Sequence, residues 1–222
     1  MVRWLKRIAL LVVTLLVLAM VAAWMLLRGS LPRLDGEAAL PGLSAAATVQ
    51  RDRLGVVTID AASEADAMRA LGYVHAQERY FGMDLMRRTA AGELSALFGP
   101  VALDFDKRQR VHRMRARATA NLRDIAGEQS AALRAYAEGV NACLEGKSAT
   151  EVSLEYAVLA ATNSEYEIEP WSAVDSLAWL KAMAWDLAGN MHDEIARASL
   201  LARGLPREQV EELYPAYPEE QH

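Results

Sequence analysis

The chain has 222 residues, room for one folded domain and one additional element. Its net charge of −5 argues against general nucleic-acid binding, because that class of protein presents a basic surface. Cys143 is the only cysteine, so the chain can form neither an internal disulfide nor a cysteine-based metal site. The four histidines, His75, His112, His192 and His222, are too scattered to indicate a histidine-rich metal motif.

Residues 8–27 form an apolar stretch that contains no charged residue. A helix of this length measures about 30 Å, which is enough to cross the hydrocarbon core of a bilayer. Three basic residues within positions 1–7 favour a cytoplasmic N-terminus, so we expect an uncleaved signal-anchor. A signal peptide cleaved near Ala22–Ala23 is the alternative, and both interpretations export the rest of the chain.

Residues 28–47 are rich in Gly, Pro, Ser and Ala, which predicts a linker between the membrane and a folded body. In the stretch Ala47–Ala61, Val49 precedes "RDRLG", and two valines and Ile59 follow it. This pattern predicts two short strands joined as a hairpin.

The rest of the chain is helical in pattern, so the expected fold class is mainly α with a short N-terminal β-hairpin.

A first helix is expected to begin at Ser63, whose hydroxyl can accept a hydrogen bond from a backbone N–H, with Asp66 assisting at the third position. Gly99-Pro100 is expected to break this helical run. Three- and four-residue spacing predicts that one face carries Met68, Leu71, His75, Glu78, Gly82 and Leu85.

Further helices are predicted over residues 107–125, 128–144 and 172–203, with a short apolar helix or strand at 154–159. In the second of these, Leu133, Tyr136, Val140 and Cys143 form the expected inner stripe. The apolar faces are too few to enclose one another, and an isolated hairpin is marginally stable in water. The chain is therefore expected to form part of something larger.

Three segments resemble one known family. "DAMRALGYVHAQERYFGMDLMRRTAAGELSALFG" (66–99) resembles the α region of the penicillin acylase family of N-terminal-nucleophile hydrolases. "PWSAVDSLAWLKAMAWDLAGNMHDEI" (170–195) is similar to its pocket-and-calcium segment, and "LYPAYP" (213–218) to the sequence before its excised spacer. The resemblance implies a penicillin-acylase-like α region over 48–212, a tail at 213–222, and an αββα sandwich (an α+β fold) when complete.

The resemblance implies that the nucleophile is a serine at the start of a separate β region, activated through its own α-amine. We therefore expect no catalytic residue among these 222 residues, and the chain alone to be inactive. Ser63, Ser95 and Ser172 are not expected to act as nucleophiles, because no "GxSxG" elbow surrounds them. Thr58 stands where many relatives carry histidine, so no role of that side chain is transferred.

By resemblance, Met183 and Leu187 match substrate-binding positions of the acyl pocket. They lie four residues apart and so share one face of a helix. A thioether and a flexible aliphatic chain adapt to different acyl groups, and leucine in place of an aromatic ring leaves room for a straight chain. The alternative is that the pair is ordinary core packing.

The resemblance also implies that Glu194 contributes to a Ca²⁺ site shared with the β region, with Asp193 as the alternative ligand. Calcium takes six to eight oxygen ligands, so one glutamate is only part of a site. The competing interpretation is a solvated helix surface on which Glu194 pairs with Arg197.

The stretch "GYVHAQERYFGMDLMRR" (72–88) contains His75 and Glu78, which we interpret as a buried framework pair rather than a catalytic one. A buried glutamate is costly unless paired, and the arginines at 79, 87 and 88 are near enough to serve. Gly72 and Gly82 are expected to allow the close approach of another backbone.

Together these features predict the α portion of an exported acylase, made as a zymogen, anchored in the inner membrane and facing the periplasm. Its expected partners are a β region of the same precursor and an N-acyl substrate, either a β-lactam or an acyl-homoserine lactone. These substrates would give it a role in antibiotic metabolism or quorum quenching. The alternative function is a non-enzymatic, membrane-anchored helical binding protein or a truncated remnant.

Overall fold

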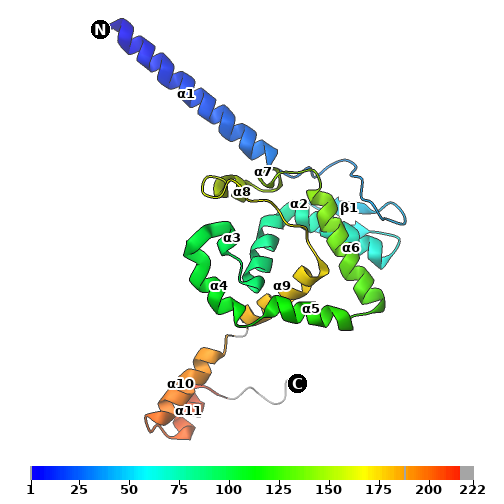
Figure 1. The fold of residues 1–222 in the computed structure, drawn as a ribbon, viewed down its shortest axis with the longest axis vertical. Helices are drawn as coiled ribbons and strands as arrows, with labels where there is room; N and C mark the ends of the chain where they lie inside the picture. The colour runs from blue at the N-terminus through cyan, green and yellow to red at the C-terminus, as the bar shows by residue number, and fades with distance from the viewer. Residues whose placement is uncertain (1, 188, 216–222) are drawn as a thin grey trace. The chain divides into compact units, whose positions relative to one another are not determined.

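A computed structural model describes residues 2–187 and 189–215 and is dominated by helices (Figure 1). The chain divides into two compact units, residues 1–181 and residues 182–222. The helix α1 (Val2–Gly29) includes the predicted apolar stretch. Within its residues Lys6–Gly29, an 18-residue window has a mean hydropathy of 2.8 and none of its residues is buried. Length and composition allow α1 to cross a membrane, and a signal sequence shares both properties.

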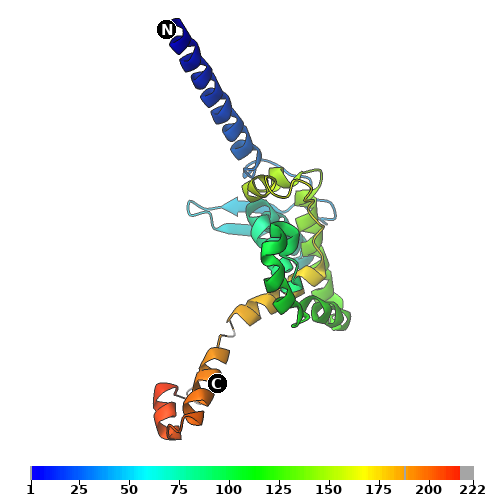
Figure 2. The same ribbon diagram turned by 60° about the vertical axis from the view of Figure 1, so that its left-hand side comes forward.

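The predicted hairpin is confirmed. Strands β1 (Thr48–Arg51) and β2 (Val57–Asp60) pair antiparallel, with Val49 opposite Ile59 (Figure 2). The carboxylate of Asp52 closes the turn by accepting hydrogen bonds from the backbone N–H groups of Leu54 and Val56, both at 2.8 Å.

The long helix α2 (Glu64–Ala91) begins as predicted at Ser63, whose hydroxyl accepts a hydrogen bond from Asp66 N at 3.1 Å. The Asp66 side chain, however, binds the linker, accepting hydrogen bonds from the backbone N–H and the hydroxyl of Ser44. The helix ends before the predicted break at Gly99-Pro100, because Gly92 adopts the left-handed conformation (φ 68°).

The predicted inner face of α2 is wrong in its second half. Arg79 has non-helical angles (φ −151°, ψ 28°), and this kink rotates the residues that follow. Gly82, after the kink, is exposed, and so is Glu78, the residue before it, whereas Leu85 still packs against the core. The buried face beyond the kink instead carries Tyr80, Met83, Asp84, Arg87, Arg88 and Ala90.

The helix α6 (Gly127–Leu144) crosses α2 at two glycines. A Cβ atom at Gly72 of α2 would lie 2.1 Å from the backbone oxygen of Tyr136, and one at Gly139 of α6 would lie 1.9 Å from that of Arg69. Only glycine permits this approach. The prediction for Gly72 is confirmed, whereas a Cβ at Gly82 would meet no described atom within 4 Å.

Val140 and Cys143 of α6 are buried as predicted, and Leu133 and Tyr136 are partly buried. Residues from α2, from the short segment after it, from α6 and from the segments after α6 meet in one hydrophobic core. Its buried members are Ala76, Tyr80, Met83, Leu97, Ala137, Val140, Cys143, Tyr156 and Trp171.

The predicted helix at 107–125 is two helices, α4 (Leu103–Arg110) and α5 (Met114–Asp124). They are separated at Arg113, which has a left-handed φ of 53°. Val111, directly after α4, is 77% exposed. Short elements complete this part of the chain: α3 (Ser95–Phe98), the 3₁₀ helix η1 (Gly99–Ala102), α7 (Ala149–Val152) and α8 (Leu154–Leu159).

The helix predicted over 172–203 is also interrupted. The structure has α9 (Ala173–Leu187) and α10 (Met191–Ala202), followed by α11 (Arg207–Leu213), which contacts α10 (Figure 2). Gly189 and Asn190 between the first two are poor helix formers, which explains the break. Most of the predicted tail, residues 216–222, lies outside the described residues.

Candidate functional site

The two predicted pocket residues lie on α9. Leu187 is 76% exposed, whereas Met183 is partly buried, and their four-residue spacing places them on one face. Leu180 on the same helix is 53% exposed. Leu180 and Leu187 are therefore exposed apolar side chains rather than members of the described core.

Glu194 lies on α10 and its side chain is 59% exposed. Its Oε1 accepts a hydrogen bond from Arg197 Nη1 at 2.8 Å, the surface pair that the sequence offered as the alternative to a metal ligand. Among the described residues, no three His, Cys, Asp or Glu side chains cluster as metal ligands. Because calcium takes six to eight oxygens, this chain fits the ion only as a minor contributor of ligands.

His75 and Glu78 bind neighbouring elements rather than each other. His75 Nδ1 lies 2.9 Å from the Tyr136 hydroxyl of α6. Glu78 accepts from Arg51 Nη2 of β1 at 2.9 Å, and its contact with Arg79 is longer, at 3.9 Å. Of the three arginines offered as partners, Arg79 makes this longer contact, and the closer partner, Arg51, was not predicted. Both contacts connect α2 to its surroundings, as a framework would.

A buried ionic cluster lies further along α2, and the sequence did not predict it. Asp84 is fully buried and accepts hydrogen bonds from Arg87 Nε at 2.7 Å and from the Tyr156 hydroxyl at 2.8 Å. Arg88 Nε lies 3.2 Å from the same carboxylate, and the Tyr166 hydroxyl also donates to it. We call these five residues the Asp84 cluster.

The Asp84 cluster keeps its central carboxylate charged. Burial opposes the charge, but Arg87, the Tyr166 hydroxyl and Arg88 together hold the pKa of Asp84 below its usual value. Two other buried aspartates behave alike. The Ser44 hydrogen bonds lower the pKa of Asp66, and burial of Asp106 is outweighed by bonds from Ser95 and Leu94 that lower its pKa.

These lowered pKa values predict acid sensitivity. An aspartate with an ordinary unfolded pKa of about 3.9 and a lower folded pKa stabilises the fold above pH 4. This stability is lost as the pH falls through the folded pKa values. We expect the free energy of unfolding, measured by urea titration, to decline as the pH falls below about 4. Constant stability down to pH 3 would contradict the assignment.

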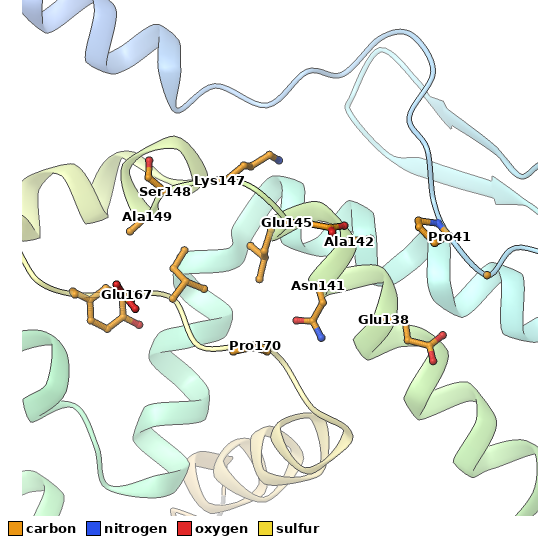
Figure 3. Close-up of a pocket in the computed structure, with 14 residues that line it drawn as sticks. Pro41, Glu138, Asn141, Ala142, Glu145, Lys147, Ser148, Ala149, Glu167 and Pro170 are labelled. Carbon is orange, nitrogen blue, oxygen red and sulfur yellow. The ribbon is translucent and has the colours of Figure 1, made fainter.

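An open groove of about 1000 Å³ lies beside the C-terminal end of α6 (Figure 3). Glu138 and Asn141 come from α6, and Glu145 and Lys147 follow it; the groove is also lined by residues 166–168 and Pro170. Met183, Leu187 and Glu194 are not among the residues that line it. The groove therefore differs from the pocket predicted from the sequence.

The family profile described as penicillin amidase matches residues 46–220. The chain belongs to the penicillin amidase family. This match covers the hairpin and all helices from α2 to α11, and it confirms the resemblance found in the sequence motifs.

Individual penicillin amidase relatives agree. The chain is 40% identical to penicillin acylase 2 proenzyme of Pseudomonas sp. (strain SE83) over 157 residues, which is 71% of this chain and 19% of that protein. It is 32% identical to acyl-homoserine lactone acylase QuiP of Pseudomonas aeruginosa over 209 residues, 93% of this chain and 24% of the relative. The chain thus spans less than a quarter of the length of these relatives.

A solved penicillin amidase structure confirms the fold. A chain of the thermostable penicillin G acylase from Alcaligenes faecalis superimposes with a TM-score of 0.60 at 26% identity. The match covers 78% of this chain and 94% of that chain. The helical arrangement described here is therefore nearly the whole of one chain in that enzyme.

The sequence contained one overlooked signal for the Asp84 cluster. Arg87 and Arg88 lie three and four residues after Asp84 in α2, among residues that are mostly apolar. Charges at such spacing on an inward face indicate a buried ion pair. From the sequence, both arginines were possible partners of Glu78. In the structure Glu78 pairs with Arg51 instead.

Proposed function

We propose that this chain is the α portion of an exported acylase that hydrolyses linear amide bonds in N-acyl compounds. The observation that carries the proposal is the identity to QuiP, which covers 93% of this chain but only 24% of the relative. The remaining length of such a protein would supply a β region whose first residue is the attacking serine. In this scheme the serine's α-amine accepts the proton, and backbone and amide donors stabilise the oxyanion.

The proposed role of this chain is to supply one wall of the acyl pocket. Met183 and Leu187 offer apolar, flexible side chains that can pack against a straight acyl group. This favours an acyl-homoserine lactone as substrate over a penicillin with an aromatic side chain. Quorum quenching is the corresponding biological role.

The decisive experiment is to produce this chain together with a β region of the family. We expect the assembled pair to hydrolyse members of a panel of N-acyl-homoserine lactones and penicillins. Hydrolysis is measured by the release of the free amine. The matched control replaces the first serine of the β region with alanine. If the pair assembles and is processed correctly but hydrolyses no member of the panel, the acylase proposal fails. A binding protein or remnant would then remain.

Pocket shape gives a sharper prediction at Leu187. Leu187→Phe fills the space for a straight acyl chain and adds an aromatic surface. We expect kcat/KM for long straight-chain substrates to fall about tenfold relative to phenylacetyl substrates, the scale of a pocket mismatch. Leu201→Phe, at an exposed leucine of α10, is the matched control and should leave the ratio unchanged. An unchanged ratio in Leu187→Phe would remove this residue from the pocket.

We also propose that Glu194 joins carboxylates of the β region around a calcium ion. Its single carboxylate would replace the bond to Arg197 with a metal contact, and the ion would support assembly. In the assembled pair, Glu194→Gln is expected to raise about tenfold the calcium concentration that is needed for the same thermal stabilisation. Glu208→Gln on α11 is the control. Equal calcium dependence in all three proteins would leave Glu194 as a surface residue.

We propose that α1 anchors the chain in the inner membrane with the folded part in the periplasm. The mean hydropathy of 2.8 over 18 residues of α1, none of them buried, supports this placement. Carbonate extraction of membranes distinguishes an anchor, which stays in the pellet, from a cleaved signal peptide, which releases the protein.

A further inference from the structure

The helix α9 begins directly after a short segment, Glu169–Ser172, whose backbone is bound by side chains of α2. Arg87 Nη2 donates to Glu169 O at 2.9 Å and its Nη1 donates to Pro170 O at 3.0 Å. The hydroxyl of Tyr80 donates to Glu169 O as well, at 3.0 Å. Two consecutive carbonyls are therefore held by α2.

The next residue is held from α6. Asn141 Oδ1 accepts from Trp171 N at 2.7 Å, and Asn141 Nδ2 donates to Trp171 O at 2.9 Å. An amide side chain can bind both backbone groups of one residue because it carries a donor and an acceptor. Figure 3 shows Asn141 of α6 facing the segment that contains Pro170. The first turn of α9 is closed by Asp175, which accepts from Ser172 N at 2.8 Å.

The groups that hold this segment are themselves fixed. Arg87 is only 2% exposed and is paired with the fully buried Asp84. Arg87 Nη1 also lies 3.9 Å from the Asp175 carboxylate. Packing alone would be satisfied by apolar side chains, and ion pairs of this kind are costly to bury. A satisfied polar network, in contrast, fixes one register of the bound backbone.

We propose that Asn141 and Arg87 are positioning residues for the acyl pocket. By binding the backbone of 169–171 they set the start of α9, the helix that carries Met183 and Leu187. A change in the direction of the first turn of a helix shifts the side chains that the helix carries, and a shift of about 1 Å is enough to change how an acyl chain is held. This inference rests on the proposed function.

The test uses the assembled α and β pair and compares three proteins: wild type, Asn141→Asp and Asn141→Ala. Asn141→Asp keeps the acceptor for Trp171 N and loses the donor, whereas Asn141→Ala loses both. We expect the ratio of kcat/KM between long and short acyl chains to change about tenfold in Asn141→Ala and less in Asn141→Asp. The change should lie in KM more than in kcat, because the pocket wall moves while the nucleophile does not.

Asp106→Asn is the control, because the buried Asp106 binds Leu94 and Ser95 rather than the segment before α9. It should lower stability and keep the acyl-chain ratio. A general loss of stability would instead affect all substrates equally in each variant, and that result overturns the proposal.

Hydrogen exchange supplies a readout that does not need activity. Asn141→Ala is expected to speed exchange at the amide of Trp171, with no such change in Asp106→Asn. Unchanged exchange overturns the anchoring, and faster exchange with an unchanged acyl-chain ratio overturns the positioning role. If the wild-type pair hydrolyses no substrate, the proposed function fails and the pocket role fails with it, while exchange still decides whether the anchor exists.

Discussion

Alanine at Gly139 is expected to destabilise the folded chain by about 3 kcal/mol, at the upper end of the cost of overpacking. The added Cβ would lie 1.9 Å from the backbone oxygen of Arg69 and 3.0 Å from Tyr73 N. Both neighbours are backbone atoms of α2, so no side chain can rotate away. The two helices must separate, and the core between them loses contacts. Urea unfolding followed by circular dichroism measures the change, and Gly72→Ala should behave alike.

Gly82→Ala is the matched control on the same helix. No described atom lies within 4 Å of the added Cβ, and Gly82 is exposed. Because alanine is favoured over glycine in a helix by about 0.5–1 kcal/mol, this change should stabilise the chain slightly. Equal effects of alanine at positions 82 and 139 would show that α2 and α6 do not cross as closely as described.

Removal of the Asp84 carboxylate is also expected to lower the free energy of unfolding by a large amount. Asp84→Ala would leave two buried arginines, Arg87 and Arg88, without their shared counter-charge. Breaking one side of a buried ion pair typically costs about 3–5 kcal/mol. The hydroxyls of Tyr156 and Tyr166 would also lose their acceptor. We expect the midpoint of urea unfolding to fall accordingly.

Two further variants separate the charge from the hydrogen bonds. Tyr156→Phe removes one donor and should cost about 1 kcal/mol. Glu211→Ala breaks the exposed pair with Arg207 and should cost less than about 0.5 kcal/mol. If Asp84→Ala costs no more than Glu211→Ala, the cluster does not carry the stability assigned to it here.

The sequence predicted those elements whose signals are local. The hairpin followed from β-branched residues around a turn, and the start of α2 followed from the capping hydroxyl of Ser63. The single helix over 127–144 was predicted within one residue of its start. The ordered motifs also identified the family, because together they are more specific than any one alone.

The errors arose where a single backbone residue changes the phase or the length of a helix. The kink at Arg79 rotated the inner face of α2, and the left-handed Arg113 divided one predicted helix into two. Periodicity assumes an unbroken helix, so it can place residues beyond such a point on the wrong face, as it did for Gly82. The roles of Met183, Leu187 and Glu194 remain predictions, because they depend on a partner segment.

The sequence by itself determined the helical class, the hairpin, the apolar N-terminal helix and the membership in the penicillin amidase family, because these depend on composition, spacing and motif order. Only the tertiary structure decided that Gly139 meets α2, that Asp84 gathers two arginines, and that Asn141 and Arg87 bind the backbone before α9. The physical reason is that these contacts join residues far apart in the chain. Their geometry is set by how closely α2 and α6 approach.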